Sequence, residues 1–134
     1  MSADPFQHLP LVQAGFPSPA NDYLEPDLDF NGYFKQHPSA TFAMRVSGES
    51  MVDAFIPHGS MVIIDRAVRP LNNSIVVATL DGERMIKHLV RTRDGIFLLP
   101  ANAKFKSIRI EEGMDFSVWG TVTHAVIDVF KPRI

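Results

Sequence analysis

Apolar residues between positions 41 and 130 occur in short runs separated by turn residues. The runs are rich in β-branched and aromatic side chains, which favour strands, and they lie at 41–46, 61–65, 74–80, 83–90, 95–99, 106–110 and 116–130. Asp81-Gly82 separates two of them and suits the positive φ angles of a tight hairpin. About seven strands with turns every 8 to 12 residues predict a mainly β fold, a compact, partly open barrel or sandwich.

The first 38 residues have a different pattern. They hold six of the ten prolines, which favour extended backbone over regular elements. We therefore expect an extended N-terminal arm at 1–38 and a β-rich domain at 39–134. Within the arm, the apolar stretch 9–16 is suited to lie as an extended strand in a groove or along a sheet edge. A brief helix is predicted at 28–37, although Asn31-Gly32 disfavours it.

Composition limits the possible functions. A chain of 134 residues is the size of one domain, and its formal net charge of -2 gives no basic field for direct nucleic-acid binding. The absence of cysteine excludes thiolate catalysis, so a nucleophile must be an oxygen. No signal peptide or membrane-length apolar run is present, and we expect a soluble, cytoplasmic protein without a membrane association.

Ser50 is the candidate nucleophile. It follows Gly48 in a turn after the first predicted strand, where backbone amides can converge beside the hydroxyl as an oxyanion hole requires. A serine in a glycine turn is more often only a turn residue whose hydroxyl bonds nearby backbone. The catalytic interpretation therefore depends on a base elsewhere in the chain.

Lys87 is the candidate base. Strand alternation places it on the same face as the apolar Met85 and Leu89. Desolvation there disfavours the ammonium form, and a neutral amine near pH 7 is a competent general base for a serine. The alternative is that this face is exposed at a sheet edge, or that the lysine stem lies along apolar surface with its charge in water.

The histidines offer a second source of a base. None has an obvious carboxylate partner or the paired spacing of a metal site, and no metal or cofactor is predicted; the five are His8, His37, His58, His88 and His124. A triad of Ser50 with a histidine and either Asp65 or Asp81 stays open at this level.

Several motifs together resemble the self-cleaving serine peptidases of the LexA and UmuD group. Residues 14–20 (AGFPSPA) resemble the cleavage region of UmuD-type mutagenesis proteins, and the later segments 37–41, 46–51, 85–87 and 119–124 are similar to that group in the same order. The stretch before Ala14 is too short for the DNA-binding domain of a LexA-type repressor. The resemblance is therefore to UmuD rather than to LexA.

This resemblance implies a site and a role. Ser50 would be the nucleophile, Lys87 the base, the amides of Glu49 and Ser50 the oxyanion hole, and Ala14-Gly15 the bond cut in the chain itself. It further implies a homodimer, stimulation by RecA filaments on single-stranded DNA, and a shortened product that serves a Y-family, UmuC-type translesion polymerase in the SOS response. It leaves open whether cleavage occurs in cis or in trans.

Two other functions remain at this stage. The chain can be a non-catalytic, protein-binding β module in which Ser50 is a turn residue. It can also be a peptidase that acts on other proteins, as the related signal peptidases do, although the missing membrane anchor disfavours that function.

Overall fold

The structure, a computed structural model, describes residues 9–16 and 29–130. In this part of the chain a short helix, α1 (Phe30–Phe34), is followed by two single-turn 3-10 helices, η1 (Pro38–Ala40) and η2 (Val52–Ala54). The strands are β1 (Thr41–Arg45), β2 (Met61–Asp65), β3 (Ile75–Leu80), β4 (Glu83–Thr92), β5 (Gly95–Leu99), β6 (Ile108–Arg109) and β7 (Phe116–Val126).

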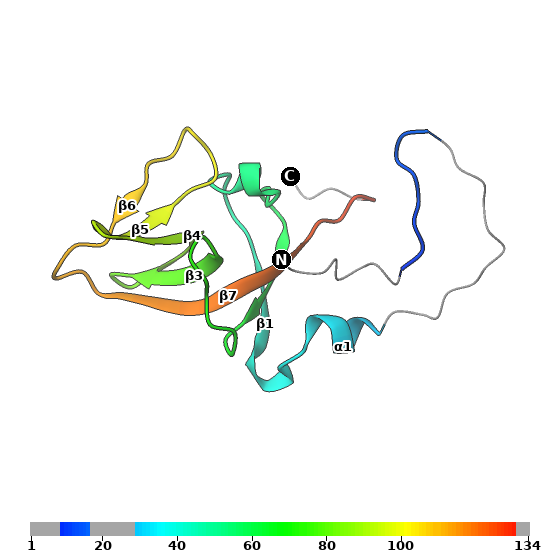
Figure 1. The fold of residues 1–134 in the computed structure, drawn as a ribbon, viewed down its shortest axis with the longest axis horizontal. Helices are drawn as coiled ribbons and strands as arrows, with labels where there is room; N and C mark the ends of the chain where they lie inside the picture. The colour runs from blue at the N-terminus through cyan, green and yellow to red at the C-terminus, as the bar shows by residue number, and fades with distance from the viewer. Residues whose placement is uncertain (1–8, 17–28, 131–134) are drawn as a thin grey trace.

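The seven strands of the described residues form one open antiparallel sheet. Their order is β1-β2-β7-β3-β4-β5-β6, so β1 and β6 are the edges and the long β7 lies inside the sheet, between β2 and β3 (Figure 1). The prediction of a mainly β fold with about seven strands is confirmed. Among the described helices none is long and apolar enough to cross a membrane.

The β3-β4 hairpin forms where Asp81-Gly82 predicts it. Leu80 pairs with Glu83 across the turn, and Asp81 and Gly82 have φ angles of 49° and 84°. Positive φ at both central residues matches the twist of the flanking strands, which is why this dipeptide favours tight hairpins. The helix predicted at 28–37 is observed as the shorter α1, Phe30–Phe34. Position 28 lies outside the described residues.

Two β-bulges interrupt the pairing of β7 with its neighbours β3 and β2. Between Val77 and Ala78 of β3 the partner shifts from Gly120 to Val118, which leaves Trp119 as the extra residue. A second shift, between Ile63 and Ile64 of β2, leaves Thr123 unpaired. A bulge bends its strand and changes the direction of a side chain. The directions of the Trp119 and Thr123 side chains therefore depend on how β7 pairs with its neighbours, and simple alternation along the strand does not give them.

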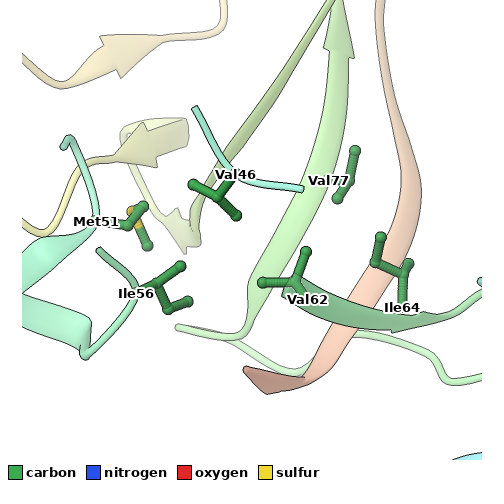
Figure 2. Packing of buried hydrophobic residues seen from close by; sticks show 6 residues of the cluster. All are labelled: Val46, Met51, Ile56, Val62, Ile64 and Val77. Carbon is green, nitrogen blue, oxygen red and sulfur yellow. The ribbon is translucent and has the colours of Figure 1, made fainter. Parts of the chain in front are cut away.

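The core consists of two clusters that alternate along the strands. The first holds Val46, Met51, Ile56, Val62, Ile64 and Val77 (Figure 2). The second holds Val76, Ala78, Leu89 and Leu98. Because neighbours on β3 belong to different clusters, the two clusters lie on opposite faces of the sheet. The first cluster matters most for function, since Met51, only 1% exposed, follows Ser50 directly.

Candidate active site

The turn that carries Ser50 is fixed at its base by β-type hydrogen bonds. The Val46 amide donates to the Ser60 carbonyl, and the Gly59 amide donates to the Val46 carbonyl, both at 2.8 Å. Gly48 has a φ of +94°, a left-handed conformation that disfavours residues with a side chain. With Met51 buried in the first core cluster, the turn has little freedom to move.

The loop that follows β5 holds the tip of the same turn. After β5, the Ala101 amide donates to the Ser50 carbonyl at 2.7 Å, and the Asn102 side-chain amide donates to the Glu49 carbonyl at 2.8 Å. The Glu49 carbonyl shares a planar trans peptide with the Ser50 amide, which points the opposite way. Fixing that carbonyl therefore fixes the direction of the Ser50 N–H, one of the two predicted oxyanion donors.

His58 also holds the turn, through a hydrogen bond with Gly48. The Gly48 amide donates to His58 Nδ1 at 3.0 Å. This bond requires an unprotonated Nδ1, because a ring nitrogen that carries a proton has no lone pair to accept with. Sequence reasoning did not identify Ala101, Asn102 or His58 as part of the site, because no spacing pattern connects them to Ser50.

Lys87 of β4 reaches Ser50 directly. Its ammonium Nζ donates to Ser50 Oγ at 2.8 Å, across 37 positions of sequence. The side chain is half-buried, with Nζ 5.8 Å from the centre of the Phe105 ring. Burial lowers the pKa of Lys87 from the ordinary value of 10.5, because a desolvated ammonium is less stable than the neutral amine. The neutral amine can accept a proton from the hydroxyl it contacts.

Ser50 and Lys87 line one groove between β1 and β4. The groove has a volume of about 340 Å³, and its walls include the apolar Met44, Val62 and Met85. An apolar groove with a hydroxyl and an amine in contact suits an extended peptide whose carbonyl meets the hydroxyl.

The predicted scissile bond lies outside this groove. Leu11, Val12 and Phe16, which flank Ala14-Gly15, are 85%, 87% and 89% exposed, and none of residues 9–16 lines the groove. Figure 1 shows this segment, in blue, well away from the sheet. In the described conformation the segment 9–16 is therefore not bound at Ser50.

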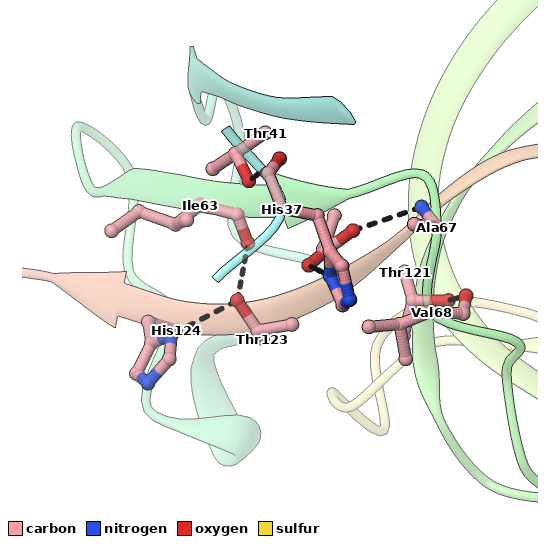
Figure 3. Close-up of polar contacts among 9 residues, drawn as sticks. His37, Thr41, Ile63, Ala67, Val68, Thr121, Thr123 and His124 are labelled. Carbon is pink, nitrogen blue, oxygen red and sulfur yellow. Dashed lines mark hydrogen bonds and ion pairs between the residues drawn. The ribbon is translucent and has the colours of Figure 1, made fainter. Parts of the chain in front are cut away.

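One of the two carboxylates considered for a triad, Asp65, does pair with a histidine, so the expectation that no histidine has a carboxylate partner was wrong for His37, but this pair forms no hydrogen bond with Ser50. His37 Nδ1 lies 2.6 Å from an Asp65 carboxylate oxygen, and the Ala67 amide donates to Asp65 at 2.8 Å (Figure 3). Burial raises the pKa of Asp65, but these hydrogen bonds outweigh it and hold the pKa below its ordinary value. Asp81 accepts from the Asp115 amide in the β3-β4 turn.

The histidines of the described residues do not reach Ser50. His88 bonds the Asn73 carbonyl, and His124 bonds Thr123 and packs edge-on against the rings of Tyr33 and Phe34. His8 lies outside the described residues. Residues 9–16 and 29–130 contain no group of three His, Asp or Glu side chains that could hold a metal ion.

Comparison with known proteins gives consistent matches over most of the chain. The family described as Peptidase S24-like matches residues 7–123. The chain is 41% identical to Protein ImpA of Escherichia coli over 115 residues, 85% of this chain and 77% of ImpA. It is 39% identical to Protein MucA of Escherichia coli over 90% of this chain and 83% of MucA. LexA repressor 1 of Geobacter sulfurreducens is 34% identical over 91% of this chain and 58% of the repressor.

Proposed function

Since the chain belongs to the Peptidase S24-like family and, within it, to the UmuD-type SOS mutagenesis proteins, we propose that it cleaves its own Ala14-Gly15 bond with a Ser50/Lys87 dyad. The observation that carries this proposal is the 2.8 Å contact between Ser50 Oγ and a lysine whose pKa burial lowers. Among the described residues, Lys87 is the basic side chain seen to form a hydrogen bond with Ser50 Oγ.

The chemistry follows from this contact. Neutral Lys87 takes the hydroxyl proton as Ser50 Oγ bonds to the Ala14 carbonyl carbon, and the oxyanion that forms accepts from the amides of Glu49 and Ser50. The intermediate collapses as the lysine ammonium gives its proton to the departing Gly15 amine. A water molecule, deprotonated by Lys87, then releases Ala14 from the ester, and the free hydroxyl re-forms.

The arm at 1–38 is the proposed substrate, and the domain at 39–134 the proposed peptidase. Small residues on both sides of the bond allow the carbonyl to approach the hydroxyl to about 3 Å in a narrow groove. The exposed segment 9–16 supplies an apolar strand for the apolar groove walls. Cleavage would therefore need the arm to move from its exposed position into the groove.

The biological role proposed is that of the UmuD-type proteins. RecA filaments on single-stranded DNA would stimulate cleavage by binding the arm-docked form better than the exposed form. The shortened product, which begins at Gly15, would act as a homodimer with a UmuC-type polymerase of the Y family. The support for this role is the similarity to ImpA and MucA over most of both chains.

The test is the identity of the product. Purified chain is incubated at rising pH, with and without RecA filaments, and its mass is measured over time. We expect loss of residues 1–14 and no loss in Ser50→Ala. Uncut protein under all conditions would support a non-catalytic binding module, while cleavage of unrelated proteins added to the reaction would support a general peptidase.

A further inference from the structure

Two arginine side chains, Arg66 and Arg84, lie against the ring of Trp119. The bulge in β7 places its ring on the face of the first core cluster, the face that also carries the serine turn. The Arg66 guanidinium carbon lies 4.5 Å from the ring centre and that of Arg84 lies 5.0 Å from it. Arg66 Nε also donates to the Trp119 carbonyl at 2.7 Å. Arg84 of β4 and Arg66, which directly follows β2, are thus both held against one indole ring.

No carboxylate of residues 9–16 or 29–130 forms an ion pair with these two arginines. The ion pairs seen between described side chains, His37 with Asp65 and Arg109 with Glu111, involve neither Arg66 nor Arg84. Both side chains are exposed. Guanidinium groups fixed by stacking lose little further entropy when they bind, and their planar N–H donors match carboxylates in two-point contacts. The site therefore suits a peptide with acidic side chains.

The site connects the active-site groove to the point where the arm joins the sheet. Arg84 lines the groove that contains Ser50 and Lys87. On the other side, the Phe42 ring packs edge-on against Trp119 at 5.4 Å. Phe42 belongs to the edge strand β1 and lines a second pocket together with Phe30, the first residue of α1. Arg84, Trp119 and Phe42 thus lie in contact with one another between the groove that contains Ser50 and the pocket that Phe30 lines.

The sequence between the proposed scissile bond and α1 is acidic. Between Gly15 and α1 the chain carries Asp22, Glu25, Asp27 and Asp29, and it has no lysine or arginine before Lys35. Asp22, Glu25 and Asp27 lie outside the described residues. Asp27 is three residues from Phe30, and three extended residues span about 10 Å. Phe30 and Phe42 line the same pocket, and Phe42 contacts Trp119. Asp27 is therefore close enough in sequence to Phe30 to reach the arginines on Trp119.

We propose that Arg66, Arg84 and Trp119 form a docking site for the acidic segment 22–27 of the same chain, which guides Ala14-Gly15 into the groove. This inference rests on the proposed self-cleavage and adds the contacts that select the arm. Charge complementarity and tethering favour the arm over nucleic acid. Residues 1–29 hold five aspartate and glutamate side chains and no lysine or arginine. Because the arm is part of the same chain, its effective concentration at the site exceeds that of a free oligonucleotide.

The first test uses fluorescence, because Trp119 is the single tryptophan of the chain. Full-length Ser50→Ala protein is titrated with a synthetic peptide of residues 16–29, and Trp119 emission is recorded. We expect a saturable change that weakens about tenfold when Asp22, Glu25 and Asp27 are replaced by amides. Equal binding of both peptides, or tighter binding of a single-stranded oligothymidylate, would overturn the proposal.

The second test uses cleavage rates. In R66E/R84E we expect cleavage to slow about tenfold, and we expect Asp22→Arg with Asp27→Arg in the same chain to restore most of the rate. Rates are compared at the upper plateau of the pH profile, since a glutamate near Lys87 also raises the pKa of that lysine. The matched control is R91E/R93E, which reverses two exposed arginines at the other end of β4 and should leave the rate unchanged.

The outcomes separate the two proposals. An unchanged rate in R66E/R84E, or a reduced rate that the arm replacements do not restore, would overturn the docking site while leaving self-cleavage intact. If wild-type chain does not cut itself, the proposed function fails, and the Trp119 titration still decides whether the acidic segment binds. Thermal unfolding of each variant identifies any loss of rate that comes from a loss of folding.

Discussion

Asn102 provides the sharpest test of how the oxyanion site is held. Its Nδ2 donates to the Glu49 carbonyl at 2.8 Å, while its Oδ1 accepts from the Lys104 amide at 3.0 Å. Asn102→Asp keeps the acceptor for Lys104 but removes the donor to Glu49. A hydrogen bond of this kind is worth about 1 kcal/mol, which corresponds to a loss of about fivefold in rate if the bond serves only the transition state.

The assay is the first-order rate of Ala14-Gly15 cleavage at the pH plateau, with thermal unfolding measured on the same samples. We expect Asn102→Asp to lose about fivefold in rate or more, because its carboxylate also repels the Glu49 carbonyl. Asn102→Ala should lose a similar amount, and it also removes the contact to Lys104. An Asn102→Asp chain that cuts at the wild-type rate would refute the view that this loop orients the Ser50 amide.

Three further changes test the rest of the site. His58→Asn keeps an acceptor for the Gly48 amide and should cut within about twofold of wild type, whereas His58→Phe should cut about fivefold more slowly, as measured by the same assay. Gly48→Ala should lose about 1 to 2 kcal/mol of unfolding free energy in urea, because its φ is +94°. Met51→Ala should lose about 2 to 5 kcal/mol in the same measurement, since Met51 is 1% exposed; a loss below 1 kcal/mol in Met51→Ala would show that the turn is not anchored there.

Much of the fold follows from local sequence patterns. Runs of β-branched residues predict the strands, and Asp81-Gly82 predicts the hairpin, because strand and turn preferences act over a few residues. The strand order does not follow from them, since β7 lies between β2 and β3 although it is last in sequence. The bulge at Trp119 could not be predicted from the sequence either, because it depends on which strands pair and in what register.

The site was predicted in part. Ser50 and Lys87 stand out because a glycine turn and an amphipathic strand are visible locally, and the resemblance to the LexA and UmuD group connects them. Asn102 lies 53 positions from Glu49 in an irregular loop, and no periodicity brings such residues together. The exposed position of segment 9–16 could not be predicted from local sequence patterns. It depends on the difference in free energy between the exposed position and the proposed position in the groove.

The pH dependence of self-cleavage tests the central proposal most directly. Neutral Lys87 is the proposed base, so the rate should rise as pH increases through the pKa of this lysine and then level off. Because burial lowers that pKa, the midpoint should lie below 10.5. The product should begin at Gly15, and both Ser50→Ala and Lys87→Ala should leave the chain intact. A rate that does not change with pH, or a Lys87→Ala chain that still cuts at Ala14-Gly15, would contradict the dyad.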